Sequence, residues 1–258
     1  MSKVMIVTGG SRGIGAAISR QAAAGGYAVA VNYTRAKDRA DALVREIVSA
    51  GGKAIAVQGD VAKEADVERL FAETARTLGA PTVLVNNAGV SVSTSIANCK
   101  AADIDYILGV NVRGVILTAR SAVRAMSKAA GGKGGVIINI SSISALYGGL
   151  PQDVIYAASK GAVDSFTLGL AKEVAGQGIR VCTVRPGLTE TEMLEPDFPE
   201  PGQAAEVARR TVPLGRIGQP DDIANAVMYL VSDAASYISG TFINVSGARE
   251  INVKMASG

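Results

Sequence analysis

The chain has 258 residues, 48% of them hydrophobic, and its 26 basic and 23 acidic side chains leave a net charge of +3. That balance excludes the strongly basic surfaces typical of proteins that bind nucleic acids or anionic membranes. The complete absence of histidine excludes a Ser-His-Asp mechanism and a His-ligated metal site, so we expect no metal.

Short β-branched runs alternate with longer Ala-rich stretches along the whole chain. In chain order the sequence predicts strand 4–7, helix 14–24, strand 27–31, helix 36–50, strand 54–57, helix 63–78, strand 82–85, helix 101–129, strand 136–140, helix 154–175, strand 179–184, helices 204–211 and 221–230, and strand 242–245. The strands are apolar without alternation, as in a sheet buried on both faces. Their alternation with helices predicts an α/β, doubly wound parallel fold, and the lack of a linker predicts a single domain over residues 1–258.

One segment, residues 189–203, is predicted as neither helix nor strand. It is long and contains Pro196, Pro199 and Pro201 together with Met193 and Phe198. Segments of this kind often cover a site as a lid, but a plain surface excursion fits the sequence equally well.

Cysteine usage and hydropathy indicate where the protein works. Cys99 and Cys182 form no CxxC motif, which is typical of a reducing compartment. No apolar run approaches the roughly 18 residues of a membrane span, and the chain enters a strand at once without a signal sequence. We therefore expect a cytoplasmic protein with no membrane or nucleic-acid partner.

A glycine-rich turn follows the first predicted strand and opens the first predicted helix. Its spacing, Gly9-xxx-Gly13-x-Gly15, is a variant of the dinucleotide-binding fingerprint. Glycines there allow close approach of a pyrophosphate, and the helix N-terminus supplies unpaired N–H groups. The residues of this turn that we expect to contact a nucleotide are Gly9, Ser11, Arg12, Gly13, Ile14 and Gly15.

The end of the second strand bears on the choice of cofactor. It reads Asn32-Tyr33-Thr34-Arg35, with no carboxylate to bind the ribose hydroxyls of NAD. Arg12 and Arg35 could instead pair with a 2′-phosphate, so all four residues are cofactor-binding candidates and NADP(H) is favoured over NAD(H). The alternative is that Arg35 is simply a solvated residue at the start of a helix.

Two further strand ends carry candidate nucleotide contacts. Asp60 and Val61 follow the third strand, where a carboxylate can accept from an adenine amino group; the alternative for Asp60 is a helix N-cap. Asn87, Ala88 and Gly89 follow the fourth strand, where small residues let a ribose lie against the backbone. Ligands of open α/β sheets bind beyond the carboxyl ends of the strands, where these residues fall.

Tyr156 and Lys160 are spaced four apart in a predicted helix, so they share one face. An ammonium near a phenol favours phenolate and lowers the pKa of the tyrosine from its usual value of about 10. A phenol tuned in this way can exchange a proton with a ketone or an alcohol oxygen near neutral pH. Alone, the pair is weak evidence, since a surface Tyr with a Lys one turn on is common.

Taken together, the chain resembles the short-chain dehydrogenase/reductase family. The resemblance rests on Thr8-Gly9-xxx-Gly13-x-Gly15, Asn86-Asn87-Ala88-Gly89, Asn111, Ser142, Tyr156-xxx-Lys160 and Pro186-Gly187, in that order. It implies a Rossmann-like sheet of about seven strands in three α/β/α layers, a nicotinamide cofactor and a homotetramer.

The resemblance also assigns roles to individual residues. Tyr156 would be the acid/base, Ser142 would hold the carbonyl oxygen, and Lys160 would lower the pKa of Tyr156 and bind the nicotinamide ribose. Asn111 would hold a water of a proton relay; a helix Asn that bonds backbone is compatible with that role. Pro186, Gly187 and Thr189 would surround the nicotinamide. Ser141 is an alternative to Ser142, but adjacent strand residues face opposite ways and the family pattern favours Ser142.

The leading functional prediction is an NADP-dependent oxidoreductase that transfers a hydride between the cofactor and a ketone or alcohol. Within it, a 3-oxoacyl-acyl-carrier-protein reductase and a sugar 1-dehydrogenase of the glucose type stay open. A carrier reductase needs a basic patch at its entrance, for which Arg124, Lys128 and Lys133 are candidates, yet Gln177 stands where such enzymes often carry Arg. A catalytically idle NAD(P)-binding regulator is disfavoured because Tyr156 and Lys160 are both present.

Overall fold

The computed structural model describes residues 3–194, 198, 200 and 202–250. Seven strands form one parallel sheet in the order β3-β2-β1-β4-β5-β6-β7. They are β1 Val4–Val7, β2 Ala28–Tyr33, β3 Lys53–Gln58, β4 Val83–Asn86, β5 Gly135–Ile140, β6 Ile179–Pro186 and β7 Phe242–Val245. The Rossmann-like α/β fold of about seven strands is thereby confirmed, and its strand order reverses between β1 and β4, where ligands of such sheets bind.

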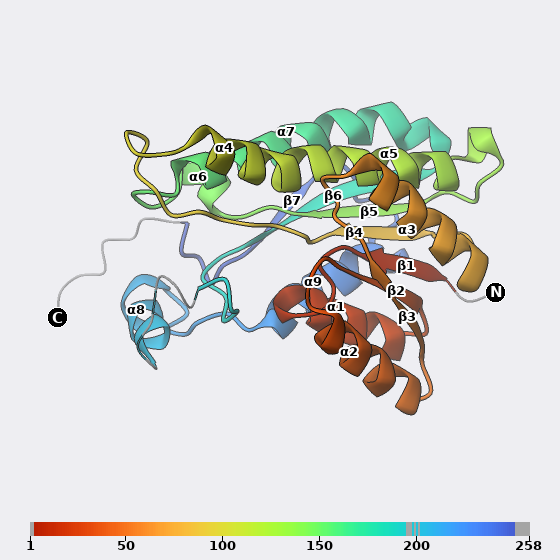
Figure 1. Ribbon diagram of the computed structural model, residues 1–258, viewed down its shortest axis with the longest axis horizontal. Helices are drawn as coiled ribbons and strands as arrows, with labels where there is room; N and C mark the ends of the chain where they lie inside the picture. Colours follow the sequence, from red (N-terminus) through yellow and green to blue (C-terminus); the bar gives the residue numbers. More distant parts are fainter. Residues whose placement is uncertain (1–2, 195–197, 199, 201, 251–258) are drawn as a thin grey trace.

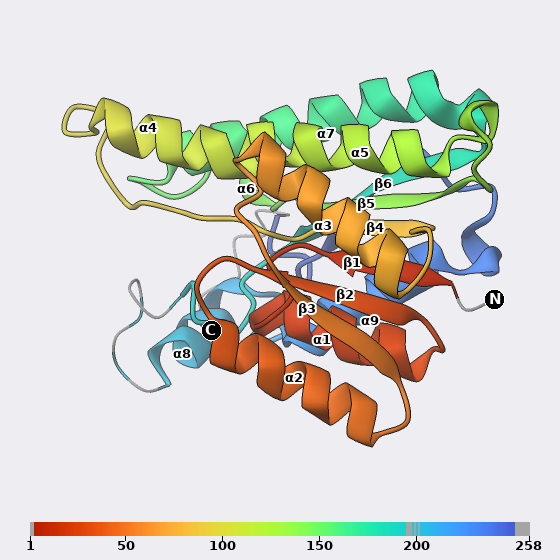
Figure 2. The same ribbon diagram turned by 45° about the vertical axis from the view of Figure 1, so that its right-hand side comes forward.

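Helices cover both faces of the sheet, as predicted (Figures 1 and 2). One layer holds α1 (Gly13–Ala24), α2 (Lys37–Ser49) and α9 (Pro220–Val231); the other holds α3 (Glu64–Thr77), α4 (Ala101–Leu108), α5 (Val115–Met126) and α7 (Val154–Val174). Two short helices, α6 (Ser144–Tyr147) and α8 (Gln203–Thr211), lie near the carboxyl ends of the strands.

The side chains of the apolar strands pack into two hydrophobic cores, one on each face of the sheet. Met5 and Val7 pack with α1 and α9 on one face, whereas Ile6 packs with α3, α5 and α7 on the other. All four residues of β1 are buried, because alternate side chains point to opposite faces and each face is covered. This is why the strands show no apolar–polar alternation.

The helix predicted over 101–129 is interrupted, which corrects that prediction. A π-helical segment, Gly109–Gly114, separates α4 from α5, and α5 ends at Met126 before a 3₁₀ turn at Lys128–Ala130. Gly114 lies against Val61, and a Cβ built on it would come within 2.8 Å of the valine methyl. Such π segments occur frequently at functional sites, and this one contains Asn111.

Several boundaries also differ from those predicted. β2 continues through Asn32 to Tyr33 and β6 continues to Pro186, because both ends pair with neighbouring strands. Helix α6 was missed, since a four-residue helix shows no apolar period. The bounds of β1 and β7 are as predicted, and the termini of the remaining elements differ by one residue. Within the segment 189–203, residues 195–197, 199 and 201, and hence Pro196, Pro199 and Pro201, lie outside the described residues.

A chain of buried polar side chains ties α5 and α7 to the sheet. The amide of Asn86 donates to Asn139 Oδ1 at 2.9 Å, and the Asn139 amide donates to Thr167 Oγ1 at 2.8 Å. Thr118 of α5 donates to Asn86 Oδ1 at 2.6 Å, and Thr183 of β6 donates to Thr167 at 2.8 Å. Because directional bonds satisfy these buried groups, they fix where the two helices sit on the sheet.

Among the described residues, every helix is too short or too polar to traverse a bilayer.

Gly114→Ala should destabilise the protein by about 1 kcal/mol or more, because its methyl group would meet Val61 at the π segment. Gly169→Ala, in α7 with nothing within 4 Å of a built Cβ, should stabilise it by roughly 0.5–1 kcal/mol. Urea unfolding of both variants measures this difference. Equal effects of the two substitutions would show that packing against Val61 does not constrain residue 114.

Candidate active site

The turn between β1 and α1 forms an open cradle. Gly9 has φ of +59°, and a Cβ there would lie 3.0 Å from Ala88 Cα, so this position requires glycine. The N-cap residue of α1, Arg12, makes no side-chain capping bond, and the first turn of α1 has no acidic residue. The first-turn N–H groups and the positive end of the helix dipole therefore suit an anionic ligand such as a pyrophosphate.

The side chain of Asn32 is hydrogen-bonded to this turn. Its amide is buried, accepts from the N–H of Gly9 at 3.3 Å and donates to the carbonyls of Val57 and Gly59 at 3.3 and 2.9 Å. Tyr33 is also buried, whereas Thr34 and Arg35 are exposed. Of the four candidates at the end of β2, Asn32 thus bonds the protein's own backbone, and Thr34 and Arg35 face outward.

The arginines expected to meet a phosphate have unequal surroundings. Arg12 lies 3.8 Å from the carboxylate of Glu192, which also pairs with Arg39 of α2. Arg35 makes no ion pair with any described residue. Sequence reasoning missed Arg39 and Glu192, since they are 153 positions apart and no local pattern relates them.

At the end of β3, Asp60 behaves as a turn residue. Its carboxylate accepts from the N–H of Ala62 at 3.0 Å, and its own N–H donates to Asp66 at 2.9 Å. Asp60 is therefore not the helix N-cap that the alternative interpretation expected, because the N-cap of α3 is Lys63; Asp60 instead holds the turn just before it. Val61 is buried and packs against Gly114.

The end of β4 is joined to the end of β1 through Thr8. Its hydroxyl accepts from the N–H groups of Asn87 and Ala88 at 3.0 and 3.1 Å, and the Asn87 amide donates to the carbonyls of Thr8 and Gly9 at 3.0 Å. A Cβ built on Gly89 would lie 3.4 Å from Lys160 Nζ. The backbone after β4 therefore runs directly beside the lysine.

Ser142 and Tyr156 form a hydrogen-bonded pair. Ser142 is also held in place because its hydroxyl accepts from the N–H of Ser144 at 3.1 Å. Ser141 turns away and donates to the carbonyl of Lys160 at 3.1 Å. Of the two adjacent serines, only Ser142 contacts the phenol.

Lys160 is 4% exposed, and its ammonium donates to the carbonyl of Ile140 at 2.9 Å. Its Nζ lies 5.5 Å from the centroid of the Tyr156 ring. Burial lowers the pKa of Lys160 to about 8, an effect that the charge of Asp164 partly opposes. The amine therefore changes charge within a physiologically accessible range.

The expected fall in the pKa of Tyr156 is not what the structure gives. Burial raises the pKa of Tyr156 to about 12, with the hydrogen bond to Ser142 opposing the rise and Asp153 and Tyr147 adding to it. Lys160 does not reverse this rise: its ammonium donates to the carbonyl of Ile140 and lies 5.5 Å from the centre of the ring. The expectation from helical spacing neglected desolvation, which acts on both groups.

Asn111 is fixed by three hydrogen bonds. Its amide bonds both the N–H and the carbonyl of Val90 at 2.9 Å, and it donates to Ser159 Oγ at 3.0 Å. Ser159 in turn donates to the carbonyl of Tyr156 at 2.6 Å. The side chain of Asn111 thus bonds protein groups and links the π segment to the loop after β4 and to α7.

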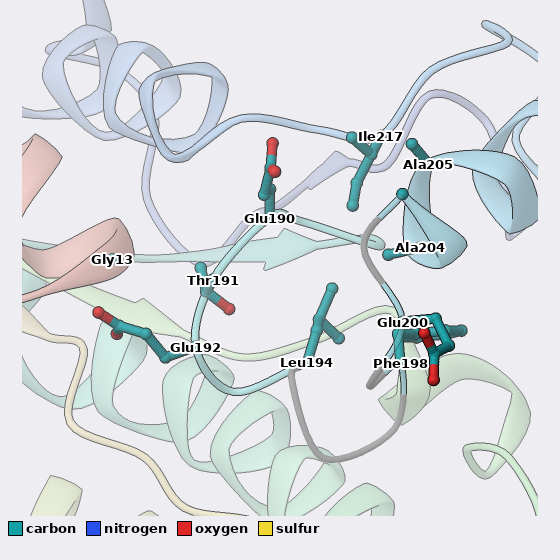
Figure 3. A pocket seen from close by; sticks show the side chains of 11 residues that line it. Gly13, Glu190, Thr191, Glu192, Leu194, Phe198, Glu200, Ala204, Ala205 and Ile217 are labelled. Atoms are coloured by element: carbon teal, nitrogen blue, oxygen red, sulfur yellow. The ribbon is translucent and has the colours of Figure 1, made fainter.

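The end of β6 completes the site. Gly187 donates to the carbonyl of Val245 at 2.9 Å, and the hydroxyl of buried Thr189 donates to the carbonyl of Gly187 at 3.1 Å. A cavity of about 480 Å³ opens between the start of α1 and the segment leading to α8 (Figure 3). It is lined by Gly13, Glu190, Thr191, Glu192, Leu194, Phe198, Glu200, Gly202, Ala204, Ala205 and Ile217.

These features fit a nicotinamide dinucleotide. The uncapped α1 terminus suits its phosphates, and the glycines at 9 and 89 leave room where side chains would block it. The ends of β1, β4, β5 and β6 carry the candidate residues at one edge of the sheet, as predicted for a ligand of an open α/β sheet.

Comparisons with known proteins agree on one kind of protein. A family model described as enoyl-(acyl carrier protein) reductase matches residues 9–247. The chain is 42% identical to the uncharacterized oxidoreductase YgfF of Escherichia coli K12 over 95% of this chain and 99% of that protein. It is 39% identical to a 3-oxoacyl-[acyl-carrier-protein] reductase of Synechocystis over 95% of this chain and 96% of that one.

Solved structures also match almost the whole chain. A short chain dehydrogenase from Burkholderia cenocepacia in complex with NADP superposes with a TM-score of 0.88 at 36% identity, covering 96% of this chain and 97% of that one. A blue fluorescent protein from a metagenomic library in complex with NADPH superposes with a TM-score of 0.86 at 35% identity, covering 95% and 96%.

Lys160→Met should raise the stability of the protein at pH 7 by about 1–3 kcal/mol, because it removes the cost of burying a charged amine. The pKa of Lys160 is about 8 in the folded protein and about 10.4 when unfolded, so the unfolded chain binds more protons in between. The gain should therefore be full below pH 8 and vanish as pH rises toward 10. Thermal and urea unfolding across this range test it, with exposed Lys172→Met of the same helix as the control; a gain that does not depend on pH contradicts the buried-charge explanation.

Proposed function

The chain belongs to the short-chain dehydrogenase/reductase family and is an oxidoreductase of that type. We propose that it transfers a hydride between NADP(H) and a small ketone or alcohol, with Tyr156 as acid/base. The observation that carries the proposal is the contact between Ser142 and Tyr156 with Lys160 buried beside them. No other described group of side chains at this edge of the sheet combines a proton donor, a positioning hydroxyl and a cation.

Each part of the cofactor has residues to hold it. The turn from Gly9 to Gly15 would hold the pyrophosphate, and Gly89 with Lys160 would hold the nicotinamide ribose. Pro186, Gly187 and Thr189 would lie along the nicotinamide side. When bound, the nicotinamide supplies or accepts the hydride, and the protein supplies position and proton.

The proton step follows from the geometry of Tyr156. Ser142 is hydrogen-bonded to the phenol, and its hydroxyl would hold a carbonyl oxygen within hydrogen-bond distance of Tyr156. With a pKa of about 12, Tyr156 keeps its proton at neutral pH and so can give it to a carbonyl oxygen during reduction. The reverse reaction needs the phenolate and gains from higher pH.

The preference for NADP(H) rests on charge. Arg35 is exposed at the end of β2, Arg12 flanks the turn, and no carboxylate ends β2. Two structurally similar proteins hold NADP or NADPH. These observations support a 2′-phosphate site made by Arg12 and Arg35.

A 3-oxoacyl-acyl-carrier-protein substrate is the second candidate, because several relatives carry that name. Against it, Arg124 lies in the last turn of α5, and Lys128 and Lys133 follow that helix. Lys133 lines a pocket together with Val83 and Gly135, at the amino ends of β4 and β5, whereas Tyr156 lies at the carboxyl ends of the strands. Within one subunit, then, the basic residues of this group do not border the entrance that an acidic carrier would approach.

We also propose a single domain that assembles as a homotetramer. Every described strand lies in one sheet, which supports a single domain. Tyr106, Leu108, Ile116 and Leu168 are more than one-third exposed on α4, α5 and α7, and such apolar side chains favour burial against another subunit.

Tyr156→Phe should lower kcat for ketone reduction by about 100-fold or more, because it removes the proton donor while keeping the ring. The measurement is hydride turnover with a panel of small ketones and alcohols, followed by absorbance of the reduced nicotinamide. Tyr237→Phe, at a fully exposed site away from the sheet edge, is the control and should leave kcat unchanged. Equal rates for the wild type and Tyr156→Phe would remove Tyr156 from the mechanism.

Arg35→Asp should lower the NADPH-to-NADH ratio of kcat/KM by about 10-fold or more, because it removes a phosphate partner and adds a ribose acceptor. The matched control is Arg45→Asp, an exposed arginine of α2 with the same change in charge. If both variants keep the wild-type ratio, the cofactor preference does not reside at residue 35.

A further inference from the structure

A buried ion pair lies one helical turn beyond Lys160. Asp164 of α7 accepts from Arg185 of β6 through the Nε atom at 2.9 Å and the Nη2 atom at 2.8 Å, both on the same carboxylate oxygen. The side chains of Asp164 and Arg185 are only 10% and 12% exposed. Burying two charges is costly, so a pair in this position calls for a reason other than stability.

The pair is also incompletely satisfied. The second carboxylate oxygen of Asp164, Oδ1, is buried and has no hydrogen-bond partner among the described residues. The guanidinium of Arg185 lies over the ring of Phe242, 3.9 Å from its centroid, which fixes its plane. The Asp164 carboxylate therefore keeps an uncompensated oxygen in a region of low polarity, where charges interact over longer distances.

The ion pair lies between α7, which carries Tyr156 and Lys160, and the end of β6. Tyr156, Lys160 and Asp164 follow one another at four-residue intervals along the face of α7 that packs on the sheet. Arg185 immediately precedes Pro186 and Gly187 at the end of β6. The ion pair thus joins the helix that carries the phenol and the amine to the strand end that borders the site.

We propose that Asp164 and Arg185 are positioning residues, which set the charge of the Lys160 amine and hold α7 against the end of β6. The effect on the Lys160 amine does not depend on what the protein catalyses. Only the expected effect of the pair on turnover rests on the proposed function. Asp164 supplies a negative charge on the same helix face as Lys160. Arg185 holds that carboxylate in place, and its positive charge weakens the attraction between Asp164 and the Lys160 amine.

Electrostatics support this arrangement. The charge of Asp164 raises the pKa of Lys160 against the larger lowering by burial. The elements packed against α7 bring few other charges to Lys160. Arg180 of β6 bonds the carbonyls of Ile238 and Leu230, and Arg113 of the π segment is exposed and bonds the carbonyl of Ala62. The remaining titratable groups on these elements are Cys182 of β6, whose pKa is raised by burial, Tyr147 of α6, and Asp103, Asp105 and Tyr106 of α4.

A structural clamp alone would make different predictions from a charge-setting pair. Removing one partner of a buried ion pair destabilises a protein whatever its function, whereas replacing both by apolar residues is often neutral. The sign of the change in the pKa of Lys160 distinguishes a charge-setting pair from a purely structural clamp. Losing the carboxylate lowers that pKa, losing the guanidinium raises it, and a clamp without electrostatic effect changes neither.

The test titrates Lys160 directly in protein labelled with [13Cε]lysine, whose Lys160 signal is assigned by its absence in Lys160→Met. Asp164→Asn keeps the shape and an acceptor for Arg185, and should lower the pKa of Lys160 by about one unit. Arg185→Met should raise it. The double variant Asp164→Leu with Arg185→Met keeps the fold if a single variant does not, and should show a smaller fall than Asp164→Asn. Asp222→Asn, which breaks a surface pair with Arg216 on the other layer, is the control and should leave the titration unchanged.

The same variants are then assayed for the pH dependence of ketone reduction. Asp164→Asn should move the high-pH limb of kcat to lower pH by about the same amount as the titration, because the amine loses its proton earlier. An unchanged titration of Lys160 in Asp164→Asn and in the double variant overturns the proposal. Absence of turnover in the wild type would contradict the proposed function but would leave the titration result standing.

Discussion

The arrangement at the sheet edge depends on the burial of one amine. Lys160 sits under the carboxyl ends of β4 and β5, with its ammonium on the carbonyl of Ile140 and the backbone of Gly89 alongside. An ammonium in such a place loses hydration, which lowers its pKa to about 8 and makes it sensitive to each charge nearby. Loss of hydration also raises the pKa of Tyr156, whose side chain is half-buried beside Lys160. The chemistry proposed for the site follows from this shared burial.

The surrounding structure holds that environment in place through polar contacts rather than through apolar packing alone. The hydrogen-bonded chain from Thr118 through Asn86 and Asn139 to Thr167 fixes α5 and α7 on the sheet. Asn111 adds a clamp between the π segment, the loop after β4 and the first turns of α7. Because hydrogen bonds are directional, these contacts limit sliding of the helices that apolar packing would tolerate.

Much of this could be read from the sequence. The apolar strands, the glycine turn and the Tyr156–Lys160 spacing sufficed for the fold, the site edge and the pairing of phenol and amine, since each depends on local pattern. What could not be read depends on contacts between distant segments. The π segment at Asn111 places that side chain on Val90 and Ser159, far away in the sequence. The amide of Asn32 is likewise bonded to the backbone of Gly9, Val57 and Gly59. The pKa of Tyr156 was misjudged because the extent of burial is a property of the whole fold.

The π segment Gly109–Gly114 has a consequence for how α4 and α5 face their neighbours. A π turn accommodates one residue more than an α turn, and each residue of an α-helix advances the side-chain direction by about 100°. The angular phase of α4 is therefore shifted relative to α5, so that one continuous run of chain packs on α7 with its first half and on α3 and the sheet with its second. A uniform helix of the same length would have to present a single stripe to both surroundings, and Asn111 would then rotate off the loop that it now anchors.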